Sequence, residues 1–175
     1  GYPESGEGSN TYVEDDYGSL SADFENATYD FSSMAPTYAT AASKLLLHHT
    51  GISVNMDYDN GGSGAQVEGV YPSAEDSFER YFKYSDDIKS INRDNFDNDT
   101  EFRDALKEEL DNSRPILHSG YGNEDYDGGH AWNTDGYQNN NIHCNWGWGG
   151  WNNGYYTVTS MMGMSYYQTC LTEVI

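Results

Sequence analysis

Gly128-Gly129-His130-Ala131-Trp132 is the stretch of this 175-residue sequence on which its fold and chemistry most depend. A second stretch, Asn145-Trp146-Gly147-Trp148-Gly149-Gly150, begins 15 residues after His130. A histidine that opens a strand after two glycines is accessible from one side, because glycine lets another segment approach closely. An asparagine on the neighbouring strand could accept the other imidazole N–H and fix the tautomer, and an indole beside the pair would exclude water. The pattern is typical of a histidine that takes a proton from a nucleophile.

From Pro115 onward the sequence predicts an antiparallel sheet, because short strand patterns alternate with Gly, Asn and Asp. Asp135-Gly136 and the segment from Gln138 to Asn140 have the composition of turns. The predicted strands are Ile116–Ser119, His130–Thr134, Asn141–Asn145, Tyr155–Thr159 and Tyr166–Leu171.

Upstream of Pro115, apolar periodicity predicts three helices. Pro36 opens the first, which ends at Gly51. The second spans Ser73–Tyr84, and the third spans Thr100–Asp111 with Asp99 as its N-cap.

The remaining segments carry weaker signals. Residues 1–35 are predicted to be an acidic surface excursion with short strands at Tyr12-Val13 and Ala27–Phe31, and Ile52–Met56 alternates like an edge strand. Helices followed by a sheet indicate the α+β class. We therefore expect a chain of about one domain in length, with a helical part over 36–114 and a sheet over 115–175.

Composition narrows the range of partners. The chain has 29 acidic residues against 8 basic ones, for a formal net charge of -21, so nucleic acids and anionic membranes are poor partners. Apolar runs all fall short of the roughly 20 residues that span a bilayer. Cys144 and Cys170 make no disulfide scaffold and have no zinc-like spacing, and either one bridge or two free thiols is possible. We expect no metal and no cofactor.

Local pattern alone leaves two other interpretations of the His130 region open. His130 could be a partly buried strand histidine beside a core cluster of tryptophans. Alternatively, Trp146, Trp148 and Trp151, separated by glycines, could form an aromatic platform of a carbohydrate-binding module.

The same motifs resemble the histidine and asparagine-tryptophan block of the streptopain family of papain-like cysteine proteases. The resemblance runs in order through most of residues 36–159. Its motifs are Gly51–Tyr58, Ile91-Asn92-Arg93 with Phe96, Asp104–Leu110 with Pro115, Gly129-His130-Ala131 with Asp135-Gly136, Asn145–Gly150, and Gly154-Tyr155-Tyr156.

This resemblance implies a papain-like fold and a cysteine endopeptidase, and it assigns roles to individual residues. His130 would be the general base, Asn145 would orient it, and Trp146 would cover the pair. Ser63-Gly64-Ala65, the backbone of Gly129, and Trp148 would lie along a protein or peptide substrate. The family further suggests a bacterial protein that is secreted or held at the cell surface, made as a processed zymogen.

The resemblance also implies that the nucleophile lies outside this chain. Gly1-Tyr2-Pro3 resembles the residues just after the family's nucleophile helix, so we expect an N-terminal chain of the same precursor to supply the thiol and complete the fold. Cys144 and Cys170 align with strands and are expected to be buried thiols. The chain could instead be a fragment or a trimmed product, or an inactive relative that only binds peptides or protein partners.

The chain departs from the family in two strands. Asn133-Thr134 replace apolar residues, and His118-Ser119 replace an aromatic and an amide-bearing residue. These changes are compatible with an altered specificity or with lost activity.

Overall fold

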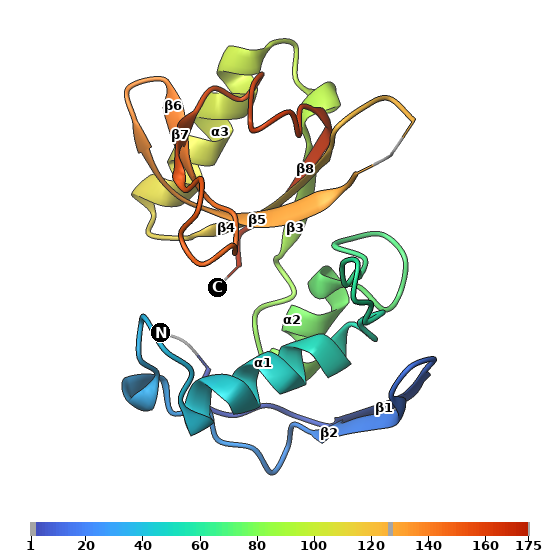
Figure 1. Cartoon of the computed structure of the whole chain (residues 1–175). Helices are drawn as coiled ribbons and strands as arrows, with labels where there is room; N and C mark the ends of the chain where they lie inside the picture. The colour runs from blue at the N-terminus through green and yellow to red at the C-terminus, as the bar shows by residue number, and fades with distance from the viewer. Residues whose placement is uncertain (1–2, 126–127, 175) are drawn as a thin grey trace. The chain divides into compact units, whose positions relative to one another are not determined.

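The computed structural model describes residues 3–125 and 128–174 (Figure 1). Gly1 and Tyr2, which carry part of the resemblance to the segment after the nucleophile helix, lie outside the described residues. The chain forms two compact units, Gly1–Asp86 and Asp87–Ile175. The first combines helices with a two-stranded ribbon and the second combines a helix with a sheet, so the predicted α+β class is confirmed.

The second unit is built on an antiparallel sheet, which the described residues form from six strands in the order β3-β8-β4-β5-β6-β7 (Figure 1). The strands are β3 (Lys89–Asn92), β4 (Ile116–Tyr121), β5 (His130–Gln138), β6 (Asn141–Asn145), β7 (Gly154–Tyr156) and β8 (Tyr166–Thr172). The short 3-10 helix η2 (Arg93–Asn95) follows β3, and α3 (Asp99–Asp111) packs against β4 and β5.

Helix α3 begins one residue earlier than predicted. Asn98, not Asp99, is its N-cap, because Oδ1 of Asn98 accepts hydrogen bonds from the N–H groups of Thr100 (3.0 Å) and Glu101 (3.1 Å). The helix buries Phe102 and Leu106 in a core that the sheet completes. The other buried members of that core are Ile116, Trp132, Ile142, Cys144, Trp146, Val158, Met161 and Cys170.

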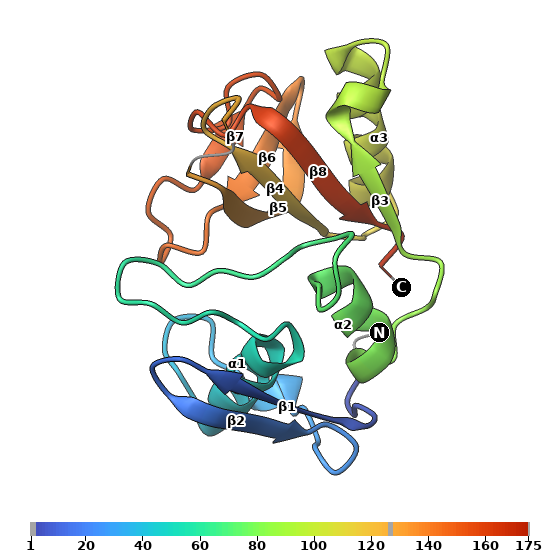
Figure 2. The same cartoon turned by 90° about the vertical axis from the view of Figure 1, so that its right-hand side faces the viewer.

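The first unit combines a hairpin of β1 (Ser9–Glu14) and β2 (Gly18–Asp23) with α1 (Ala41–Ser53), α2 (Ala74–Phe82) and the short 3-10 helix η1 (Phe31–Ser33) (Figure 2). Its core is largely aromatic. Phe24 and Tyr29 are at most 1% exposed, so the predicted surface excursion over residues 1–35 instead supplies core side chains. Ala27–Phe31 is not a strand: Thr28 forms only an isolated bridge with Ser5.

The boundaries predicted for the first helix are wrong at both ends. Thr40 caps α1 through a reciprocal capping box with Ser43, so the helix begins at Ala41 and not at Pro36. It continues through Gly51 to Ser53, and the edge strand predicted over Ile52–Met56 does not form. By contrast, α2 lies within the predicted range, with Ser73 as its N-cap.

In the sheet, the predicted strands occur but several differ in length. Asp135-Gly136 is not a turn; it is an irregularity inside β5, where the pairing with β6 shifts between Thr134 and Gly136. Strand β7 ends at Tyr156 and does not reach Thr159. Strands β2 and β3 were not predicted, because both are short and largely polar.

Candidate active site

His130 is the first residue of β5 and is half-buried. It lies opposite Gly120 of the neighbouring strand β4. The preceding residue, Gly129, lies against the ring of Tyr121, so close that an added Cβ would come within 2.8 Å of Cε1 of that tyrosine. The glycine predicted to allow a close approach is therefore in contact with an aromatic ring, and His130 emerges at the end of the strand.

One hydrogen bond defines the tautomer of His130. Its Nε2 lies 2.9 Å from the backbone carbonyl oxygen of Trp146. A carbonyl can only accept, so Nε2 carries the proton and Nδ1 is left with its lone pair. The geometry therefore leaves Nδ1 as the nitrogen that can act as a base.

Three indoles surround the imidazole. The Trp148 ring centroid lies 4.9 Å from that of His130, Trp146 lies 6.0 Å away, and Trp132 lies 6.5 Å away with the two planes only 14° apart. Trp132 and Trp146 are almost fully buried, whereas Trp148 is 40% exposed. The imidazole thus has a dry aromatic side, which strengthens electrostatic interactions there.

The indoles do not form a row open to solvent. Trp146 is fully buried, while Trp151 is 73% exposed. A sugar-stacking platform requires accessible ring faces, so Trp146, Trp148 and Trp151 do not together provide the predicted carbohydrate-binding surface.

The side chain of Asn145 contacts its own loop. Asn145 pairs with Asn133 across the β5–β6 ladder, and its Oδ1 accepts a hydrogen bond from the N–H of Gly147 at 3.2 Å. Gly147 has φ of 76°, a conformation that favours glycine and turns the chain away from the strand. The role of Asn145 in orienting His130 stays a prediction.

Asn153 is a residue that sequence analysis missed. Its Oδ1 accepts a hydrogen bond from the N–H of Trp146 at 3.1 Å. Trp146 is thereby held through its N–H while its carbonyl accepts the hydrogen bond from Nε2–H of His130. No local pattern marks Asn153, because its contact depends on how the 146–153 loop closes.

The two cysteines are unsuited to be the nucleophile. Both are buried, as predicted for strand thiols, and no disulfide joins them. Burial raises the pKa of Cys144 to about 12, so its thiolate is scarce at neutral pH.

The remaining predicted substrate-binding residues, Ser63, Gly64 and Ala65, lie in an exposed loop of the first unit. Gly64 exchanges two backbone hydrogen bonds with Asp57, each 2.9 Å long, which close the loop. Their role in binding substrate stays a prediction.

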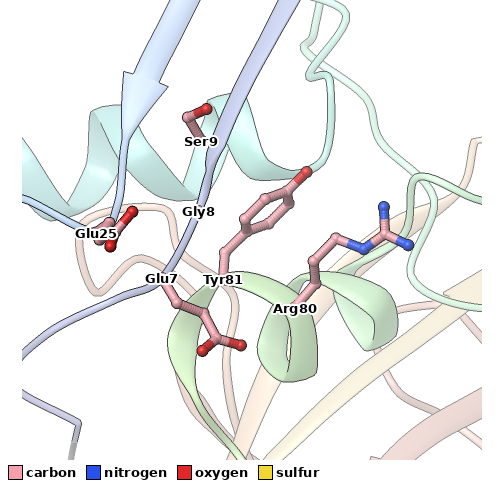
Figure 3. A pocket seen from close by; sticks show the side chains of 6 residues that line it. All are labelled: Glu7, Gly8, Ser9, Glu25, Arg80 and Tyr81. Atoms are coloured by element: carbon pink, nitrogen blue, oxygen red, sulfur yellow. The ribbon is translucent and has the colours of Figure 1, made fainter.

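A separate pocket in the first unit is lined by side chains of mixed charge (Figure 3). Its lining residues are Glu7, Gly8, Ser9, Glu25, Arg80 and Tyr81. This set contains neither a histidine nor a thiol, and none of the residues that the sequence predicted to be catalytic or substrate-binding. Its chemistry does not suggest a second catalytic centre.

Comparison with known proteins shows to which family the chain belongs. The model of the peptidase C10 family matches residues 1–156. Streptopain of Streptococcus pyogenes is 29% identical over 150 residues, which cover 81% of this chain and 36% of streptopain. The thiol protease/hemagglutinin PrtT of Porphyromonas gingivalis is 30% identical over 164 residues, covering 87% of this chain and 18% of that protein. The chain thus spans about a third of the length of the streptopains that it matches.

Solved structures agree with the sequence matches. Active wild-type interpain A, a cysteine protease of Prevotella intermedia, superposes with a TM-score of 0.81 at 30% identity, covering 97% of this chain and 75% of interpain A. A prointerpain A fragment from the same organism gives a TM-score of 0.80 at 31% identity, covering 99% of this chain and 58% of the fragment. The papain-like fold is therefore shown, the predicted resemblance is confirmed, and the chain belongs to the peptidase C10 family.

Proposed function

We propose that this chain is the histidine-bearing part of a cysteine endopeptidase, and that an upstream segment of the same precursor supplies the nucleophilic thiol. The observation that carries the proposal is the state of His130: Nε2–H is engaged by the Trp146 carbonyl, Nδ1 is available as a base, and indoles shield one side. Family membership supports the reaction class.

The proposed chemistry is a two-stage acyl transfer. Nδ1 of His130 takes the proton of the thiol, and the thiolate attacks the substrate carbonyl. As the C–N bond breaks, the imidazolium returns the proton to the leaving amine, and a thioester remains. Water then attacks the thioester as His130 accepts a proton from that water. The C–S bond breaks to release the acid product, and the imidazolium returns its proton to the thiolate.

The residues around His130 would stabilise its charged form. The Trp146 carbonyl accepts from Nε2–H, and this hydrogen bond strengthens when the ring becomes an imidazolium. Asn145 would add an orienting contact once the thiol-bearing segment is in place. Substrate would run past Gly129 and the half-exposed Trp148, with Ser63-Gly64-Ala65 as a further contact.

The setting of this activity is proposed from the resemblance. We infer a peptidase that is secreted or displayed on a bacterial cell and is activated by processing of a zymogen. In the part of the chain that the structure describes, no helix is both long and apolar enough to cross a bilayer.

The test uses the complete precursor, processed to its mature form. A thiol-alkylating inhibitor should label one cysteine upstream of Gly1, and His130→Ala should lower kcat/KM for peptide cleavage by about a thousandfold or more. His143→Ala is the matched control, because His143 lies on the adjacent strand β6, is paired with Asp135, and should leave cleavage unchanged.

Two results would contradict the proposal. Labelling confined to Cys144 or Cys170 would place the reactive thiol in the wrong part of the protein. A complete protein that binds peptides without cleaving them would instead favour an inactive relative.

A further inference from the structure

His118 is a buried histidine in the core beneath the candidate site. It lies on β4, directly across the ladder from Trp132 of β5, and is fully buried. Its ring stacks on the Trp132 indole with centroids 4.4 Å apart and planes 25° apart. Trp132 is the same indole whose plane lies within 14° of the His130 ring. His118, Trp132 and His130 therefore form a stack from the core to the site.

Thr134, which like His118 departs from the family pattern, holds the His118 ring in place. Nδ1 of that ring lies 3.2 Å from Oγ1 of Thr134, which follows Trp132 by two residues on β5 and shares its face of the sheet. Burial lowers the pKa of His118 to about 3, so the ring is neutral at any pH where a peptidase of this kind would work. A neutral ring can stack closely on an indole without burying a charge.

Trp132 is confined on its other sides as well. The Trp146 ring lies 4.8 Å away, with planes 39° apart. Gly120, beside His118 on β4, leaves room for the far edge of the indole, because an added Cβ would come within 3.2 Å of Cη2. The indole therefore has the rings of His118, Trp146 and His130 as neighbours, and its Cη2 edge lies close to the backbone of Gly120.

We propose that His118 is a positioning residue for His130: its flat ring, fixed by Thr134, sets the plane of Trp132, and Trp132 sets the plane of the imidazole. Only the expected effect on the rate of peptide cleavage rests on the proposed function; the arrangement of the rings does not. An aliphatic side chain at position 118 would fill the space but would let the indole tilt. Misplacing a catalytic group by about 1 Å can cost about a hundredfold in rate.

The experiment compares two double variants of the complete processed protein. His118→Phe with Thr134→Val keeps a flat ring under Trp132 and removes the polar atoms on both sides of the hydrogen bond. His118→Leu with Thr134→Val is matched in polarity but lacks the flat face. Ile142→Ala is the control for core damage, because Ile142 is fully buried on β6 opposite Tyr137, seven residues along β5 from His130.

Two readouts are used. The first is the split of peptide cleavage into kcat and KM. The second is the NMR signal of the His130 ring in histidine-labelled protein, assigned by its loss in His130→Gln, which reports the ring currents of the surrounding indoles without requiring activity. If the wild-type protein cleaves nothing, the proposed function fails, and the NMR comparison still decides this inference.

The expected result is that the Leu variant loses about tenfold or more in kcat with KM little changed, and that its His130 signal moves. The Phe variant should match the wild type in both readouts, and Ile142→Ala should leave the His130 signal in place. The inference is overturned if the Phe and Leu variants behave alike, or if Ile142→Ala moves the His130 signal as much as the Leu variant does.

Discussion

Glu109 is a nearly buried carboxylate that joins three segments of the second unit. It lies near the end of α3 and accepts hydrogen bonds from Arg114 at 2.6 and 2.8 Å and from the backbone N–H of Glu173 at 2.7 Å. The Arg114 hydrogen bonds hold its pKa below the usual range. The carboxylate therefore depends on Arg114 to offset the cost of its burial.

Arg114→Met should lower the free energy of unfolding by about 2 kcal/mol, because the Glu109 carboxylate would remain buried without its cation. Lys89→Met is the matched control: Lys89 pairs with Glu173, but the lysine side chain is 63% exposed, so the pair is screened by solvent and we expect little or no loss of stability. Urea denaturation followed by tryptophan fluorescence measures both. Equal losses in the two variants would contradict this account.

At the level of single residues, the sequence predicted one pair of neighbours but not the hydrogen bond that joins them. His130 and Trp146 were predicted to be neighbours, and they are. The hydrogen bond between them was missed, because it uses a backbone carbonyl, whose direction follows from a turn at Gly147 and from Asn153. The contact of His118 with Thr134 was likewise invisible, although both had been noted as departures from the family, since it depends on strand register.

Among the elements, α1 shows where periodicity misleads. Pro36 and Gly51 look like helix boundaries, yet neither is one. The start is set by the Thr40–Ser43 capping box. Gly51 is helical, and the hydroxyl of Tyr58 occupies the space beside it, so that an added Cβ would clash with that oxygen. A glycine that looked like a stop signal is therefore a packing requirement.

Gly51→Ala should consequently destabilise the first unit by about 1 kcal/mol, because the clash with Tyr58 outweighs the gain of about 1 kcal/mol that alanine brings to a helix. Adding Tyr58→Phe removes the oxygen and leaves the ring carbon Cζ at 3.1 Å, so the double variant should regain most of the loss. Thermal unfolding monitored by far-UV circular dichroism provides the measurement. A stabilised single variant would show that Tyr58 simply moves aside.

For the whole molecule, predictability differs between the two units. In the second unit, strand alternation and the apolar face of α3 lie within short windows, so the covering helix and most strands were predicted, although the short, polar β3 was missed. The core of the first unit is assembled from aromatic rings far apart in sequence, such as Phe24, Tyr29 and Phe82. Acidic neighbours of those rings suggested a solvated surface, and no local pattern reveals that the rings meet.

Each unit buries one histidine. In the first unit, His49 is 6% exposed and its Nδ1 lies 2.9 Å from the Tyr29 hydroxyl; in the second unit, His118 is fully buried. Burial is the main cause that lowers the pKa of each ring. All four tryptophans belong to the second unit, so their fluorescence reports that unit.

Acidification should therefore weaken both units before ordinary carboxylates begin to titrate. Below a pH of about 6.5 the unfolded chain binds a proton at each histidine that the folded chain does not, so stability is full above that pH and falls as the pH drops toward the folded pKa. For His118, with its pKa near 3, the loss between pH 7 and pH 5 should be about 2 kcal/mol.

The His118→Phe, Thr134→Val variant should flatten the pH dependence of urea unfolding read by tryptophan fluorescence. His49→Phe should instead flatten the pH dependence of amide exchange in α1. A slope that both variants leave unchanged would mean that other groups carry the acid sensitivity.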